Sequence, residues 1–306
     1  MAAKNTHEPD TGLEKHSIET IKRHLARTTR AKKMWNLITS DPGIQASWRM
    51  ANYVASTKLG MNDHGGIHAK VATASALTML GLLDDSPVRP DIIAGGFGTR
   101  DDAALVVLTA MLCHDLGNMV HREDHATLGV TLAIPVLDRL LPEIYDDTEQ
   151  RTAIRSFILS AIYTHHGVPK PLSIEAALVC IADSTDMTKG RGRVAFESGS
   201  ITIHSVSALA IEQVEIRKGT EKPIELLIHM SNSAGIFQVQ EILAPKVRAG
   251  PLAGFVEVVA VTASGPGKTE KTIVDGIRME GSRFVPVNGT GGSQKAAAQK
   301  KKTGRR

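Results

Sequence analysis

The feature that most constrains the fold is a histidine–aspartate pair that directly follows a long apolar run. The run extends from Ala103 to Cys113, and His114 and Asp115 come next. An apolar segment of this kind is buried, and an ionised aspartate is almost never buried without a partner, because an unpaired buried charge is costly. A metal ion is the partner that best offsets this cost. The pair therefore predicts a buried helix that ends at a metal site.

Further metal-binding side chains gather in the same part of the chain. Seven of the twelve histidines lie between positions 64 and 166. Imidazole and carboxylate groups bind Zn, Mn, Fe or Ni, and Mg when carboxylate and water dominate. Helical bundles build metal centres from such side chains on several facing helices. The candidates, in chain order, are His64, His68, His114, Asp115, His121, His125, His165, His166 and Asp183.

The first two thirds of the chain are expected to be helical. The sequence is aliphatic, and only 4% of its residues are aromatic, which favours helices. Between the helices, residues 84–100 contain two prolines and three glycines and are expected to form a surface loop. Apolar spacing and cap residues predict helices over 17–37, from Asp41–Pro42, over 67–83, from Thr99 or Asp101 to 114–115, over 123–140, over 147–164 and from Ser173.

The pattern changes after Arg193 to β-branched runs. Strands are expected over 208–217, 224–230 and 255–263, with a helix over 234–246 and a weaker segment near 278–287. The fold class is therefore mainly α, an all-helical metal-binding domain followed by a small α+β domain. The expected bounds are a disordered N-terminus over 1–16, a helical domain over 17–193, an α+β domain over 194–288 and a disordered basic tail over 289–306.

The net charge of +4 comes from the tail. Six basic residues and no acidic residue lie within 290–306, so the remainder of the chain is negative overall. The tail is interpreted as a solubilising end, with weak non-specific contact to nucleic acid or anionic surfaces as the alternative.

The two cysteines and the hydropathy indicate a cytoplasmic protein. Cys113 and Cys180 both lie in apolar stretches and are expected to be buried thiols without a disulfide. The first residues contain no apolar signal segment, and no apolar run is long enough to span a bilayer. We therefore expect no membrane association.

Three segments resemble the HD-domain superfamily of metal-dependent phosphohydrolases. His68, the pair His114–Asp115 and Asp183 follow its order H…HD…D. The residues around them, at 62–71, 114–125 and 181–191, are similar to a group of HD proteins common in archaea and some bacteria. The resemblance covers about 60–195 and implies a C-terminal companion domain, for homodimerisation or for ligand sensing.

The resemblance also implies the metal ligands. The four residues of the H…HD…D pattern hold one metal in this superfamily, and members with extra histidines before the last aspartate hold two. His125 and His165 fall where those extra ligands are expected, with His121 and His166 as competitors. The implied cofactors are one or two divalent ions: Mn, Fe, Zn, Mg or Ni. The expected ligands are His68, His114, Asp115, His125, His165 and Asp183.

The expected activity is hydrolysis of a nucleotide or related phosphoester by metal-activated water. A two-metal centre can hold a phosphate oxygen and lower the pKa of water toward neutrality, and Asp115 could bridge both ions. The phosphoryl charge also needs cations from the protein. The expected catalytic residues are Asp115, Arg122, Lys189 and Arg191, and Lys70 and Arg193 also flank ligand positions. For residues 189–193, a solvated interdomain linker is an equal alternative.

Two other functions fit the same residues. Some HD-like proteins hold two irons with a similar histidine-rich set and activate dioxygen. Alternatively, the protein is a metal-bound sensor in which 231–235 offers backbone N–H groups to an anion, although a capped strand-to-helix loop explains that segment too. Asp186 is expected to support a ligand or cap a helix. The sequence contains no glycine-rich nucleotide-binding motif of the P-loop or dinucleotide type.

Overall fold

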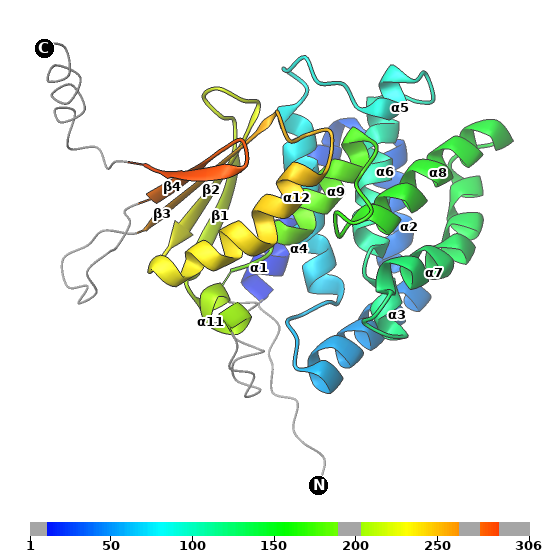
Figure 1. Ribbon diagram of the computed structural model, residues 1–306. Helices are drawn as coiled ribbons and strands as arrows, with labels where there is room; N and C mark the ends of the chain where they lie inside the picture. The colour runs from blue at the N-terminus through cyan, green and yellow to red at the C-terminus, as the bar shows by residue number, and fades with distance from the viewer. Residues whose placement is uncertain (1–10, 189–202, 263–275, 288–306) are drawn as a thin grey trace, which may run out of the picture.

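Helix α6 (Arg100–Cys113) packs among several helices of the region before residue 189, and every residue from Asp102 to Cys113 is buried. Neighbouring helices α2, α4, α8 and α9 all contact it. The computed structural model describes residues 11–188, 203–262 and 276–287 (Figure 1). The other helices before residue 189 are α1 (Thr11–His24), α2 (Arg30–Ser40), α3 (Pro42–Asn52), α4 (Gly66–Leu82), α5 (Asp91–Ala94), α7 (His125–Leu140), α8 (Thr148–Thr164) and α9 (Ile174–Thr185), with short η1 (Leu25–Arg27), η2 (Tyr53–Lys58), η3 (Leu116–Met119) and η4 (Leu141–Glu143) between them.

Side-chain caps fix the helix starts that the sequence predicts. Asp41 accepts a hydrogen bond from the Ile44 backbone N–H at 2.9 Å, and Ser173 caps α9 in the same way. At α6 the cap is Thr99, because Thr99 and Asp102 form a reciprocal capping box. Asp101, the alternative cap, instead accepts from the first backbone N–H groups of α2.

Two helical expectations need correction. The helix expected over 17–37 is two helices, and α1 begins at Thr11, so residues 11–16 are helical and not disordered. The loop expected over 84–100 contains α5, which is fixed by a distant partner. Glu175 accepts from the Ile92 N–H at 2.9 Å, while Asp91 accepts from the Ile174 N–H at 2.6 Å. This reciprocal capping of α5 and α9 has no local signal.

The C-terminal region, residues 203–287, is the predicted small α+β unit. The five strands that the structure describes here lie in sequence order in one sheet, and of their pairings only β2–β3 is parallel. The expected final segment is a hairpin of two strands that turns at Gly281, whose φ of 58° is left-handed. The elements are α11 (Ile203–Leu209), β1 (Ile211–Arg217), β2 (Ile224–Met230), η5 (Ser233–Gly235), η6 (Gln238–Leu243), α12 (Ala244–Ala249), β3 (Val256–Thr262), β4 (Gly276–Glu280) and β5 (Arg283–Pro286).

The β2–β3 crossover joins the sheet to the helices. Figure 1 shows α12 between the sheet and α9, and α12 and η6 both contact α9. Asn232 caps the start of this crossover by accepting from the Ala234 N–H at 2.9 Å, which fits a structural loop. The expected domain boundary at 193/194 lies outside the described residues, as do the 1–10 segment and the basic tail. Across the described ranges, no helix combines the length and the hydropathy needed to cross a bilayer.

A buried carboxylate connects α2, α6 and the loop that follows η4. Asp102 is fully buried and accepts hydrogen bonds from the Tyr145 hydroxyl at 2.5 Å and the Thr99 hydroxyl at 2.8 Å. Arg30 Nη1 lies 3.0 Å from the same carboxylate. Burial raises the pKa of Asp102, but the Tyr145 and Thr99 hydrogen bonds and the Arg30 charge outweigh it and lower the pKa below its usual value.

Replacing Asp102 with asparagine is expected to destabilise the fold in a pH-dependent way. The amide loses the charge and turns a donor toward other donors, so we expect a loss of at least about 2 kcal/mol at pH 7. Because folding lowers the Asp102 pKa, its contribution is complete above the unfolded pKa of about 3.9 and is lost as pH falls through the folded pKa. Denaturant unfolding should show the gap to wild type closing below about pH 4. Asp85→Asn at an exposed carboxylate is the control, and equal effects of the two changes would contradict this account.

Candidate metal centre

Two glycines allow the backbone of α7 to approach the His114–Asp115 turn at the end of α6. A Cβ atom on Gly117 would lie 1.9 Å from the His125 carbonyl oxygen. One on Gly129 would lie 3.1 Å from the His114 carbonyl oxygen. On the other side, the buried Trp48 indole N–H donates to the Leu112 carbonyl at 2.9 Å. Both contacts fix where the His–Asp pair projects.

The first ligand group combines three helices. His68 on α4 has its Nε2 3.2 Å from His114 Nε2 and 3.1 Å from Asp183 Oδ1. The distance from His114 Nε2 to Asp183 Oδ1 is 3.4 Å. One ion could touch all three side chains, because their ligand atoms lie within 4.8 Å of one another. All three expected ligands are thus brought together.

A second group of three histidines lies beside the first. His125 Nε2 is 3.2 Å from His165 Nε2 and 2.7 Å from His166 Nε2. Asp115 lies between the two groups, because its Oδ2 is 3.3 Å from His114 Nε2 and its Oδ1 is 3.5 Å from His125 Nε2. The carboxylate therefore faces both groups at once.

Hydrogen bonds on the far side of each ring fix the tautomers. The Nδ1 atoms of His114, His125 and His165 lie 2.6–2.8 Å from the carbonyl oxygens of residues three positions earlier. His68 Nδ1 lies 2.7 Å from Asp186 Oδ2. A ring that donates from Nδ1 presents the Nε2 lone pair, as metal-binding histidines do. Four Nε2 atoms thus converge, in a geometry that a bound metal ion could use.

The electrostatics of the cluster also favour a cation. Burial lowers the pKa of His114, but Asp115 and Asp183 outweigh it and raise that pKa to about 10. Burial raises the pKa of Asp115, yet the surrounding imidazoles, with His114 first, hold it well below its usual value. Burial and the Lys246 charge lower the pKa of His166 to about 3, so this ring is neutral and able to bind metal at pH 7.

The donor set fits a divalent metal. Asp115 Oδ2 is buried and has no hydrogen-bond partner among the described residues. A buried orphan carboxylate oxygen is expensive unless a cation meets it. Nitrogen and oxygen donors in this mixture suit Mn, Fe, Zn or Ni, and the two groups could hold one ion each.

The structure places the remaining candidate histidines in three different settings. His121 is exposed, and its Nδ1 accepts the Glu123 N–H, so it lies apart from both groups. His166, the other competitor of His125 and His165, faces the cluster together with both of them. His64 is buried with its ring 5.8 Å from that of His68, and its Nδ1 lies 2.6 Å from the Asn62 carbonyl. The predicted cations Lys189, Arg191 and Arg193 lie outside the described residues.

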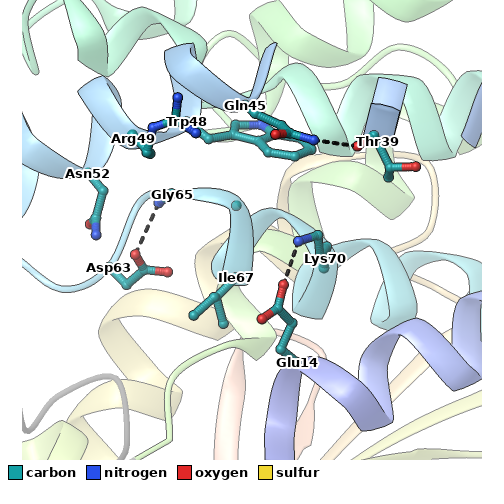
Figure 2. A pocket seen from close by; sticks show the side chains of 11 residues that line it. Glu14, Thr39, Gln45, Trp48, Arg49, Asn52, Asp63, Gly65, Ile67 and Lys70 are labelled. Atoms are coloured by element: carbon teal, nitrogen blue, oxygen red, sulfur yellow. Dashed lines mark hydrogen bonds and ion pairs between the residues drawn. The ribbon is translucent and has the colours of Figure 1, made fainter. Parts of the chain in front are cut away.

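Lys70 lines a separate cavity, and the described residues that line it include none of the proposed metal ligands. Its Nζ lies 2.5 Å from Glu14 Oε1 and 5.6 Å from the centre of the Trp48 ring. Figure 2 shows Trp48 on one side of this cavity and Asp63, Gly65 and Lys70 on the other. The cavity has a volume of about 400 Å³. Lys70 is thus paired with Glu14 beside Trp48, whereas the candidate cation Arg122 lies at the ligand groups.

Two residues at the centre were not predicted from sequence. Asn118 Nδ2 donates to Asp115 Oδ1 at 2.7 Å and holds that carboxylate in place. Its amide oxygen accepts from Arg122 Nη1 at 3.2 Å, which brings this predicted cation beside the cluster. Lys246 on α12 donates to Asp183 Oδ2.

Two residues discussed from the sequence also have defined surroundings. Asp186, the expected supporting residue, places its Oδ2 beside His68 Nδ1. Cys113 is fully buried, and burial raises the pKa of its thiol to about 12.

Comparisons with known proteins agree with this geometry. The family model described as the HD domain matches residues 80–188. The uncharacterised protein MJ1020 of Methanocaldococcus jannaschii is 36% identical over 229 residues, which are 75% of this chain and 88% of that protein. A ribonuclease Y of Nitratiruptor is 27% identical over 113 residues, 36% of this chain and 19% of the enzyme. No solved structure matches the chain.

The chain therefore belongs to the HD-domain superfamily, a superfamily of metal-dependent phosphohydrolases that bind divalent ions. Among the described residues, the two ligand groups and Asp115 between them could hold such ions.

Proposed function

We propose that the protein is a metal-dependent phosphohydrolase that cleaves a nucleotide or a related small phosphoester. The observation that carries the proposal is the convergence of five imidazole Nε2 atoms and two carboxylates in a largely buried cluster, in which Asp115 Oδ2 has no hydrogen-bond partner among the described residues. The residues that would hold the ions are His68, His114, Asp115, His125, His165, His166 and Asp183.

Divalent ions at such a site polarise a phosphoryl oxygen and bring the pKa of bound water toward neutrality. The side chains of the protein position these ions. Asp115 faces both ligand groups, and Asn118 keeps it there. Because burial keeps His165 and His166 neutral, their lone pairs stay available at pH 7 without loss of a proton.

Arg122 is the cation that we assign to the substrate phosphoryl group on the Asp115 side. Its Nη1 lies 3.9 Å from Asp115 Oδ1 and 3.1 Å from His125 Nε2. The side chain is 28% exposed, so it can meet solvent and substrate as well as the cluster. A guanidinium has five N–H donors in a planar fork, which suits bidentate contact with phosphate oxygens.

Small nucleotides are the preferred substrate class, and RNA is the alternative to test. Because the chain is partly similar to a ribonuclease Y, phosphodiesters of RNA are included among the substrates to test.

We also propose a cytoplasmic location. Both cysteines are buried and free, which fits a reducing cytoplasm.

The proposal is tested by incubating the Mn-loaded protein with nucleoside mono-, di- and triphosphates, simple phosphomonoesters, cyclic nucleotides and short RNA. We expect metal-dependent release of phosphate or nucleotide from at least one class. Absence of hydrolysis across the whole panel would contradict the proposal. Bound iron with substrate-dependent oxygen uptake would favour an oxygenase, and a ligand that raises Tm without turnover would favour a sensor.

A further inference from the structure

A lysine from the C-terminal region reaches the metal centre. Lys246 Nζ donates to Asp183 Oδ2 at 2.5 Å, and only 11% of the lysine side chain is exposed. The contact depends on close packing of α12 against the α8–α9 loop. A Cβ on Gly167 would lie 3.2 Å from Ala249 Cβ, and Gly250 is similarly close to Ala177.

Asp183 divides its two oxygens between the ligand histidines and Lys246. Oδ1 faces His68 and His114, at 3.1 and 3.4 Å from their Nε2 atoms, whereas Oδ2 faces the ammonium. The ammonium therefore lies at the border of the first ligand group, with His166 in its electrostatic reach.

The Lys246 ammonium carries more N–H donors than it uses in hydrogen bonds to the described residues. A lysine carries three N–H donors, and within the described ranges Lys246 donates one hydrogen bond, to Asp183. Because a largely buried ammonium is costly unless its donors find acceptors, the remaining N–H groups favour an anionic oxygen ligand at this point. A phosphoryl group supplies both the charge and several acceptor oxygens.

We propose that Lys246 binds a phosphoryl oxygen of the substrate, so that the C-terminal region completes the active site. The inference rests on the proposed function. Arg122 approaches the centre from the loop before α7 and lies against Asp115 and His125. Lys246 approaches from α12 and lies against Asp183. Two cations from separate parts of the chain thus flank the two carboxylates.

The test compares Lys246→Met with wild type and with Lys218→Met, a control at an exposed lysine of the same region. Inorganic phosphate is titrated into the Mn-loaded proteins by calorimetry, bound metal is measured by mass spectrometry, and KM and kcat are taken on a substrate from the panel. Loss of one charge-assisted contact should raise the phosphate Kd and KM by about tenfold or more, with metal content unchanged. Lys246→Arg should retain most of the phosphate affinity.

Three results would overturn the inference. The first is a phosphate Kd for Lys246→Met within about twofold of the wild-type Kd. The second is a Lys246→Met protein that loses metal, while the molecules that keep their metal bind phosphate as tightly as wild type does. The third is a wild-type protein that binds no phosphate. If Lys246→Met is poorly folded, Lys246→Gln gives the same comparison. Weakened phosphate binding in a protein that hydrolyses no phosphoester would support the role of Lys246 while rejecting the proposed function.

Discussion

Replacing His114 or Asp115 with alanine is expected to abolish metal binding and hydrolysis together. His114 belongs to the first ligand group, and Asp115 faces both groups. Removing a residue that only supports a metal ligand lowers metal affinity or activity roughly 10- to 100-fold. Removing a ligand itself should therefore lower metal affinity and activity at least about 100-fold. Bound metal per chain and hydrolysis rate are both measured, with circular dichroism to establish that each variant is folded.

His121→Ala is the matched control for these variants. His121 was a sequence-based candidate for the same centre, but it is exposed and lies outside both groups. It should retain wild-type metal content and activity. A folded His114→Ala protein that keeps both its metal and its activity would show that His114 is not a metal ligand.

Gly117→Ala is expected to damage both stability and the centre, although glycine and alanine differ by one methyl group. The added Cβ would lie 1.9 Å from the His125 carbonyl oxygen, which is backbone and cannot rotate away. Separation of α7 from the His–Asp turn would move His125 from Asp115. We expect a loss of about 3 kcal/mol or more in denaturant unfolding, and weaker Mn binding.

Gly254→Ala controls for the loss of glycine itself. A Cβ at this position meets no heavy atom within 4 Å, so the variant should unfold like wild type. If Gly117→Ala and Gly254→Ala were equally stable and bound Mn equally well, the close backbone approach would not be needed for the centre.

The parts of the molecule that depend on local chemistry were predictable. Asp41 and Ser173 begin their helices as expected, because a short polar side chain before an apolar helical pattern caps locally. The apolar run before His114 predicted a buried α6, and the structure confirms it. The order of histidines and aspartates also indicated which side chains to look for at one centre.

The choice among the extra histidines depended on a turn that spacing cannot reveal. His121 and His125 are four residues apart and would share a face if that segment were helical. Asp124 has a left-handed φ of 56°, so α7 begins only at His125 and the two rings separate. Spacing alone therefore could not exclude His121.

Long-range contacts were beyond prediction from one sequence. Lys246 lies 63 residues from Asp183, and nothing near either residue indicates the contact. Asn118 lies three residues after Asp115, and only the folded turn shows that its amide donates to the Asp115 carboxylate. The pairing of Asp91 with α9 and of Glu175 with α5 is hidden for the same reason.

The most direct test of this account is the metal content of protein purified without added metal, measured by mass spectrometry before and after saturation with Mn. Because imidazoles and carboxylates converge on positions that suit a metal ion, and Asp115 Oδ2 has no hydrogen-bond partner among the described residues, we predict at least one tightly held divalent ion per chain, lost in Asp115→Ala. A folded wild-type protein that contains no divalent ion and takes up none would contradict the assignment of this cluster as a metal centre.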